Sequence, residues 1–414
     1  MTLLETLGKQ AKKAAFFLNN ATTKAKNNAL LSIVKHLDNN MEDILSANKK
    51  DIELARENGI PETMVDRLLL TKERIHTMQQ DIKTTIELDD PIGKVDHMWR
   101  NEDNLLIGKQ RVPLGVIGMI YESRPNVTTD ASSLALKSGN AIILRGGKEA
   151  FHSNQALVHT IQAALDAVDF PKECVQFIDD TSRETATKFM QLSDYLDVLI
   201  PRGGANLIQS VIKNATVPVI ETGTGNCHIY VDDKANLEMA KDIVINGKCQ
   251  RPSVCNATES LLVNKSIATN FLSLVGPELD NHHVELRADK EALPYLPTAK
   301  LATEEDFATE FNDLILAIKL VDGLDEAIHH INHYGTKHSE VIVTDSYQNS
   351  QKFMQQIDAA VVYVNASSRF TDGSVFGFGG EIGISTQKLH ARGPMGLNDL
   401  TTTKYIVFGE GQIR

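Results

Sequence analysis

The sequence predicts an α/β protein in which parallel β-sheets are covered by helices on both faces. From Asp89-Asp90-Pro91 onward, short apolar stretches with strand character alternate with helical patterns. This alternation is typical of strand–helix–strand units, whose parallel strands are buried on both sides. The first ~95 residues carry a helical apolar period instead. At 414 residues the chain is too long for one simple core, so we expect two or three domains.

The N-terminal region is predicted to be helical throughout. Apolar residues within 29–37 fall on one helical face, and residues 51–56 belong to a second, polar-faced helix. Pro61 opens a third helix, since proline is well tolerated at a first helical position.

Two series of strands follow these helices. The first comprises residues 115–120, 141–144, 175–178, 198–200 and 217–220, with helices over 153–168 and 182–191. The second comprises residues 227–231, 260–263, 314–321, 341–344 and 360–364. The chain ends in a predicted strand, residues 403–408, which has no obvious partner nearby. Such a strand usually joins another sheet, of its own chain or of a neighbouring subunit.

The composition is typical of a globular enzyme, with 42% hydrophobic and 23% charged residues. The 42 basic and 54 acidic groups give a net charge of −12, which disfavours nucleic acid and anionic membranes as partners. Four cysteines are too few for a disulfide scaffold and suit a reducing, cytoplasmic location. We expect no signal peptide, no membrane span and no metal site, because the thirteen histidines form no ligand pattern.

The candidate nucleophile is Cys255, which follows the turn Gln250-Arg251-Pro252-Ser253. A thiol in a polar loop beside an arginine can be held as thiolate, the form that attacks a carbonyl carbon. Cysteines are also common as small buried apolar residues, and this stretch alone leaves both interpretations open.

Two turns with paired glycines follow predicted strands. Arg145-Gly146-Gly147-Lys148 follows residues 141–144, and Pro201-Arg202-Gly203-Gly204 follows residues 198–200 and opens a helix. Cations, close-approaching backbone and helix N-terminal amides at strand ends suit a phosphate-bearing ligand. Neither turn has the G-x-G-x-x-G pattern, and each could be a plain strand-to-helix connection.

Two further turns carry polar side chains. Glu221 begins a glycine-containing turn after residues 217–220, and Asn126 lies in the turn after residues 115–120. Asn126 could present an amide donor to a ligand, although an asparagine in a turn more often caps the local backbone.

Taken together, these motifs resemble the aldehyde dehydrogenase superfamily. The resemblance covers nearly the whole chain and is most specific in residues 250–257 and in the block 364–397. It implies two doubly wound parallel-sheet domains with a helical N-terminus and a small β-flap for oligomerisation. The expected boundaries are 1–93 and 112–226 for the cofactor-binding domain, 227–388 for the catalytic domain, and 94–111 with 389–414 for the flap.

The resemblance is to the branch of the superfamily that reduces an acyl phosphate. It implies NADPH-dependent reduction of L-glutamyl 5-phosphate to L-glutamate 5-semialdehyde, with release of phosphate, in proline biosynthesis. Cys255 would form a thioester, and Asn126 with the Cys255 N–H would hold the oxyanion. It further implies a homo-oligomer and leaves a glutamate kinase partner open.

The binding residues are also taken from the resemblance. The cofactor set is Arg145, Gly146, Gly147, Lys148, Gly203, Gly204, Gly223 and Glu310. Lys148 stands where relatives often carry a ribose-binding glutamate, which predicts a preference for NADPH. The substrate set is Arg251, Arg369, His390 and Arg392, each of which could instead be a structural ion-pair partner.

The role of Glu221 and two alternatives to the acyl-phosphate reductase stay open. Glu221 aligns with the superfamily's water-activating glutamate, which a reductive enzyme does not need. A CoA-acylating or hydrolytic aldehyde dehydrogenase is a second candidate activity, although Arg369-Phe370-Thr371-Asp372 argues against it. A non-catalytic nucleotide-binding protein is the third.

Overall fold

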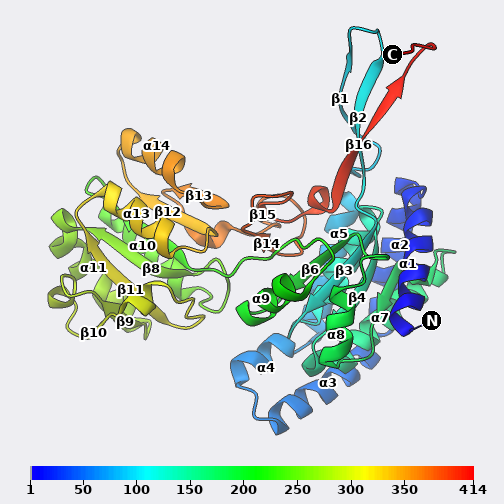
Figure 1. The fold of residues 1–414 in the computed structure, drawn as a ribbon. Coiled ribbons are helices and arrows are strands. Elements are labelled where there is room, and N and C mark those ends of the chain that lie inside the picture. The colour runs from blue at the N-terminus through cyan, green and yellow to red at the C-terminus, as the bar shows by residue number, and fades with distance from the viewer. Residues whose placement is uncertain (1) are drawn as a thin grey trace. The chain divides into compact units, whose positions relative to one another are not determined.

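The computed structural model describes residues 2–414 and confirms the predicted α/β class, with parallel sheets and helices that alternate along the chain (Figure 1). The chain forms two compact units. The first contains the chain up to Thr222 together with Gly377–Gly383 and Met395–Arg414, and the second contains Gly223–Phe376 and Ile384–Pro394. This division puts residues 223–226 in the second unit. It divides the expected flap, with residues 94–111 and 395–414 in the first unit and residues 389–394 in the second.

The first unit begins with a group of helices. They are α1 (Leu3–Asn19), α2 (Thr23–Asn39), α3 (Met41–Glu57), α4 (Glu62–Leu68) and α5 (Lys72–Glu87). The side chain of Thr2 accepts the N–H of Glu5, and the Glu5 carboxylate accepts the N–H of Thr2, so a capping box fixes the start of α1. The predicted apolar face of α2 is buried, with Leu30, Ile33 and Leu37 at 0–1% exposure. Pro61 stands just before α4, at its N-cap.

A parallel four-stranded sheet with the order β5-β4-β3-β6 forms the centre of this unit. Its strands are β3 (Val116–Tyr121), β4 (Ala141–Gly146), β5 (Val175–Phe177) and β6 (Val198–Arg202), joined through α6 (Asn126–Lys137), α7 (Phe151–Asp166), α8 (Arg183–Met190) and α9 (Ala205–Asn214). Because the strands are parallel, the turns that follow β3, β4 and β6 meet at one edge of the sheet.

The predicted strand over residues 217–220 was wrong. Only a single bridge, Leu199 to Val219, forms there. Pro218 has no N–H to donate, and the N–H of Val217 bonds to the carbonyl of Met190 instead, so no ladder can extend.

The second unit holds a seven-stranded parallel sheet with the order β10-β9-β11-β8-β7-β12-β13. The strands are β7 (Cys227–Val231), β8 (Thr258–Asn264), β9 (Glu285–Ala288), β10 (Lys300–Leu301), β11 (Ile315–Val321), β12 (Ser339–Val343) and β13 (Val361–Val364). The helices are α10 (Leu237–Cys249), α11 (Ala268–Asn281), α12 (Glu304–Phe307), α13 (Leu324–Tyr334) and α14 (Tyr347–Gln356). The sequence did not predict the short edge strands β9 and β10.

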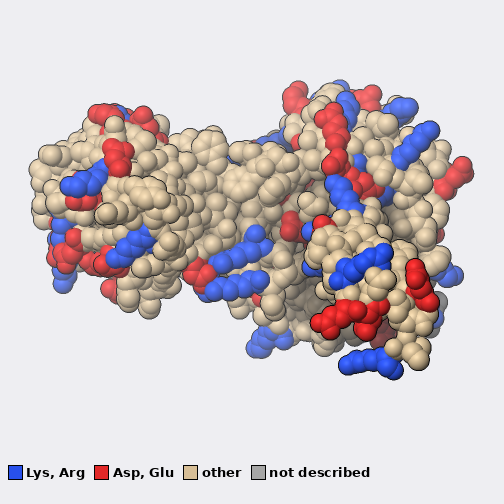
Figure 2. Space-filling model, turned by 90° about the horizontal axis from the view of Figure 1, so that it is seen from above, with Lys and Arg blue, Asp and Glu red and all other residues tan. Residues whose placement is uncertain are grey.

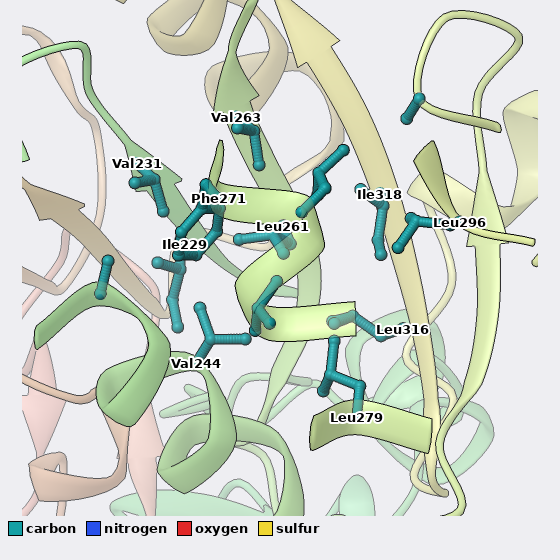
Figure 3. Packing of buried hydrophobic residues seen from close by; sticks show 14 of the residues in the cluster. Ile229, Val231, Val244, Leu261, Val263, Phe271, Leu279, Leu296, Leu316 and Ile318 are labelled. Atoms are coloured by element: carbon teal, nitrogen blue, oxygen red, sulfur yellow. The ribbon is translucent and has the colours of Figure 1, made fainter. Parts of the chain in front are cut away.

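Alternate residues of these strands pack into two hydrophobic cores, one on each face of the sheet. Leu261 and Val263 of β8 pack with α10 and α11, where Phe271 and Leu279 are fully buried (Figure 3). Leu262 faces the opposite way and packs with residues of α13 and α14. The central strands β7, β8, β11 and β12 are therefore buried on both faces, which explains their largely apolar sequences.

A separate antiparallel sheet is made of β1 (Val95–Arg100), β2 (Leu106–Pro113) and β16 (Thr401–Phe408), in the order β1-β2-β16. Figure 1 shows it as a narrow ribbon in which the terminal strand lies beside β2, and Lys404 is opposite Gln110. The terminal strand thus has its partner within its own chain. Two-stranded pairing of β14 (Ile384–Ser385) with β15 (Gly393–Pro394) completes the set of strands.

Six short 3-10 helices fill connections: Lys148–Ala150, Lys172–Cys174, Lys265–Ile267, Leu293–Tyr295, Ser368–Phe370 and Leu397–Leu400. Across residues 2–414, no helix combines the length and apolar character that a membrane span requires.

Candidate active site

Cys255 lies on the turn between α10 and β8, half-buried. The two ends of this segment are joined by a fully buried pair, because Lys248 Nζ lies 2.5 Å from Glu259 Oε2. The backbone N–H of Asn312 donates to the other Glu259 oxygen at 3.2 Å. Burial raises the pKa of Glu259 to about 7, against the opposing effect of Lys248. The turn that carries the thiol is therefore closed at its base by buried polar contacts.

The start of β7 packs directly against the backbone of Cys255. The Cys227 thiol donates to the Cys255 carbonyl oxygen, with a sulfur–oxygen distance of 3.3 Å. A Cβ atom at Gly225 would lie 1.6 Å from the same oxygen, so only glycine fits there. The Cys255 peptide is thus held from one side by residues 225–227.

The segment that contains Arg369 holds the turn from another side. Asn256 Nδ2 donates to the Thr371 carbonyl at 2.8 Å, and Ser368 Oγ donates to the Asn256 carbonyl at 2.7 Å. Two segments more than a hundred residues apart are therefore joined next to the thiol, and they belong to the two stretches in which the resemblance is most specific.

Cations stand close to Cys255. Arg369 Nε donates to Gln250 Oε1 at 3.1 Å. Burial lowers the pKa of Arg369, as does neighbouring Arg251, while Cys255 has the opposite effect. Arg369 therefore lies in the electrostatic neighbourhood of both Arg251 and the thiol, and its positive charge favours a thiolate.

The other cysteines have different surroundings. Burial raises the pKa of Cys174 to about 12, raises that of Cys227 well above its usual value, and also raises that of Cys249. Since a thiolate is needed for attack, these three thiols are poor nucleophiles.

The remaining predicted substrate residues lie elsewhere in the second unit. Arg392 Nη2 binds Asp358 Oδ1 at 2.7 Å, and Lys337 and Lys388 reach the second oxygen of Asp358 at 3.3 and 3.1 Å. Arg392 therefore has an ion-pair partner within the second unit. His390 is exposed, with a φ of 67°, in the connection between β14 and β15.

Glu310 and Gly223 also have intramolecular partners. Glu310 Oε1 accepts the Gly225 N–H at 2.7 Å, which supports the same backbone that packs on Cys255. The Gly223 N–H donates to the Ile384 carbonyl at 2.7 Å. Glu221 is half-buried and immediately precedes the boundary between the two units.

In the first unit, the turn after β4 carries Arg145 and Lys148. Arg145 is half-buried, and its Nη2 donates to the Thr181 carbonyl at 2.6 Å. Its Nε is buried without a hydrogen-bond partner among the described residues. Lys148 is exposed. A Cβ at Gly146 would lie 2.2 Å from Asn154 Nδ2, and one at Gly147 2.2 Å from Glu149 Oε1, so a side chain at either position would displace one of these groups.

The turn after β6 meets a carboxylate that follows β3. Glu122 Oε2 accepts the Gly204 N–H at 3.2 Å, and a Cβ at Gly203 would lie 2.5 Å from the same oxygen. The sequence placed Gly203 and Gly204 correctly at the start of a helix. It missed Glu122, although this residue directly follows a strand at the same sheet edge.

Asn126 is the first residue of α6 and is exposed. Its Nδ2 donates to Asp130 Oδ2 at 2.9 Å, one helical turn further on. Burial and neighbouring Asp81 raise the pKa of Asp130 to about 7. The sequence did not single out Asp130, whose position four residues after Asn126 was the available signal.

Within residues 2–414, no group of His, Cys, Asp and Glu side chains has the arrangement of a metal site. On the face drawn in Figure 2, acidic and basic side chains are interspersed.

Comparison with known proteins decides the family. The profile of the aldehyde dehydrogenase family matches residues 4–293 and 296–406. The chain belongs to the aldehyde dehydrogenase family. Gamma-glutamyl phosphate reductase of Enterococcus faecalis is 62% identical over 414 residues, which are 100% of this chain and 99% of that protein.

Solved structures agree with this assignment. The crystal structure of gamma-glutamyl phosphate reductase from Thermotoga maritima is 51% identical, with a TM-score of 0.97 over 100% of both chains. An acetylating aldehyde dehydrogenase from Geobacillus thermoglucosidasius, 17% identical, gives a TM-score of 0.70 over 99% of this chain and 97% of its own, and shares the fold. The resemblance read from the sequence is confirmed, and within the aldehyde dehydrogenase family the chain groups with the gamma-glutamyl phosphate reductases.

Proposed function

We propose that this aldehyde dehydrogenase reduces L-glutamyl 5-phosphate to L-glutamate 5-semialdehyde with NADPH, releasing phosphate, as a step of proline biosynthesis. The observation that carries the proposal is the half-buried Cys255, on a turn fixed by Gly225, Cys227 and Thr371, beside Arg369. Full-length relatives named for the same activity support the choice of substrate.

Cys255 attacks the acyl carbon as a thiolate, and the carbon–oxygen bond to phosphate breaks to leave a thioester. The amide of Asn126 and the N–H of Cys255 stabilise the oxyanion during this step. The positive charge of Arg251 and Arg369 lowers the cost of forming the thiolate and suits the anionic substrate. Cys255 is released when the reduced carbon leaves as the aldehyde.

The edge of the four-stranded sheet fits a dinucleotide. The two turns bring backbone of Gly146, Gly147, Gly203 and Gly204 to the carboxyl ends of parallel strands, and Arg145 has an unpartnered buried Nε there. Lys148 lies exposed at the same edge and suits the 2′-phosphate of NADPH. NADPH, when bound, supplies the hydride that reduces the thioester.

We further propose that the enzyme is a cytoplasmic homo-oligomer. The sheet β1-β2-β16 exposes Trp99, Tyr405, Val407 and Phe408 at 38, 65, 55 and 58%. Exposed apolar side chains gathered on one short sheet mark an interaction surface. A glutamate kinase is a second candidate partner, because the acyl phosphate it makes is the substrate here.

Turnover in the reverse direction tests the proposal. Glutamate 5-semialdehyde, phosphate and NADP⁺ should yield NADPH, monitored by its absorbance, and omission of phosphate should stop the reaction. A reaction that needs CoA instead of phosphate, or that proceeds with water alone, would support the acylating or hydrolytic alternatives and contradict this assignment.

A further inference from the structure

Glu122 lies where the dinucleotide is expected to bind. Its side chain reaches from the end of β3 to the N-terminus of α9, where Oε2 accepts the Gly204 N–H at 3.2 Å. The first amides of a helix are the groups that bind phosphate best, because they are unpaired and carry the positive end of the helix dipole. The Glu122 carboxylate therefore already accepts the Gly204 N–H, an amide that could otherwise bind a phosphate.

A second carboxylate reinforces this arrangement at the neighbouring turn. Glu149 Oε1 accepts the N–H and the hydroxyl of Ser123 at 2.8 and 3.0 Å, and its carboxylate lies against Gly147. Besides burial, the negative charge of Glu149 raises the pKa of Glu122, and the positive charge of Arg145 lowers it. Burial lowers the pKa of Arg145, and Asp180 in turn acts to raise it. The expected phosphate site thus contains negative charge of the protein's own.

We propose that Glu122 competes with a cofactor phosphate for the Gly204 amide, so that binding of a nicotinamide dinucleotide requires the Glu122–Gly204 hydrogen bond to be given up. This inference rests on the proposed function, which places the dinucleotide at this sheet edge. Its consequence is that Glu122 limits cofactor affinity and favours release of the oxidised cofactor after each turnover.

The competition should depend on pH. Burial and Glu149 raise the pKa of Glu122, although the Gly204 N–H and Arg145 oppose them. Protonation removes the charge that repels the phosphate. Affinity is therefore expected to rise as the pH falls through the raised pKa of Glu122.

Calorimetric titration of the full-length protein with NADP⁺ and with NAD⁺ tests the proposal. Glu122→Gln keeps an oxygen acceptor for the Gly204 N–H and removes the charge. It should bind both cofactors about 3–10-fold more tightly, since one close like charge is lost. The pH dependence is best followed with NAD⁺, which lacks the 2′-phosphate that titrates near pH 6, and it should flatten in the variant.

Glu184→Gln is a matched control, because Glu184 is an exposed glutamate of α8 whose contact is with Lys188. It should leave both dissociation constants unchanged. Weaker binding by Glu122→Gln would show that Glu122 is a direct ligand, for example of a ribose hydroxyl, and would overturn the proposal. Unchanged binding would overturn it as well. Wild-type protein that binds neither cofactor would contradict the proposed function itself, which separates the two failures.

Discussion

At the residue scale, Cys255 differs from the other cysteines because it is half-buried, beside arginines, with its carbonyl fixed by Cys227. Cys255→Ser should abolish turnover with little change in the thermal midpoint, because a neutral hydroxyl is a far weaker nucleophile than a thiolate. Cys174→Ala serves as the control and should keep most activity. An active Cys255→Ser enzyme would refute the nucleophile assignment.

Asn126→Ala should lower kcat by ~10²–10³-fold, the usual loss for one oxyanion donor. Glu221→Gln should do much less in the reductive direction, because no water needs activation. Single-turnover rates of thioester formation measure the first effect directly. Equal losses in both variants, with circular dichroism unchanged, would assign Glu221 a role in the reaction.

Lys148→Glu tests cofactor choice. A carboxylate there repels a ribose 2′-phosphate that a lysine attracts, so the preference for NADPH over NADH should fall by roughly 10–100-fold. The ratio of kcat/KM for the two cofactors, in wild type and variant, is the measurement. Lys172→Glu is a control on another exposed connection. A wild type that prefers NADH would contradict this interpretation of the turn.

Asp130 should make stability depend on pH. Its pKa is raised from 3.8 to about 7 in the folded protein, so the native state holds the proton more tightly than the unfolded chain. Stability therefore falls as the pH rises from about 4 to about 7 and then levels off. Asp130→Asn cannot ionise, so its stability does not fall in this way as the pH rises. The substitution should raise the free energy of unfolding at pH 8 by ~1–2 kcal/mol, a value reduced because solvent screens a half-buried carboxyl. Urea unfolding at pH 5.5 and pH 8 measures the difference, which should be about half as large at the lower pH, because pH 5.5 lies midway between the unfolded and folded pKa values.

At the scale of elements, the start of β7 is the support of the nucleophile turn. Gly225→Ala places a methyl group within 1.6 Å of the Cys255 carbonyl oxygen unless the turn moves. We expect loss of about 10²-fold or more in kcat, because small displacements of a nucleophile are costly. Gly323→Ala, also in the second unit, meets no atom within 4 Å and is the matched glycine control. Full activity of Gly225→Ala would show that the turn can shift without harm.

Elements with a strong local signal were predictable from the sequence. The strands β3, β4, β7, β8, β11 and β12 are continuous apolar runs, and their periodicity identified them. Residues 217–220 show the limit of that signal, since this apolar run forms only one bridge, and Pro218 offers no N–H to extend it. Within the site, residue type and spacing pointed to Cys255 as the candidate nucleophile and to the glycine turns. The same signals could not point to Glu122 or Asp130, because the contacts of these carboxylates depend on which backbone amide or side chain folding brings to them.

At the scale of the whole molecule, the ribbon β1-β2-β16 is the surface expected to join subunits. Trp99 and Tyr405 pack edge to face, with ring centroids 6.2 Å apart, and Val407 follows on the same side of β16. Val407→Lys should shift the assembly toward smaller species in light scattering after size-exclusion chromatography. Lys404→Gln, on the same strand, should not. A monomeric wild type would contradict the proposed oligomer.

The pairing of β16 with β2 also has a consequence for synthesis. During translation β2 (Leu106–Pro113) emerges nearly three hundred residues before β16 (Thr401–Phe408), the strand with which it pairs. The second unit, apart from Ile384–Pro394, is one continuous stretch and can condense while translation continues. The first unit is completed only when the final residues emerge. Until then, β2 presents an unpaired edge to other nascent chains, so the order in which the chain is made sets the period during which it needs chaperone protection.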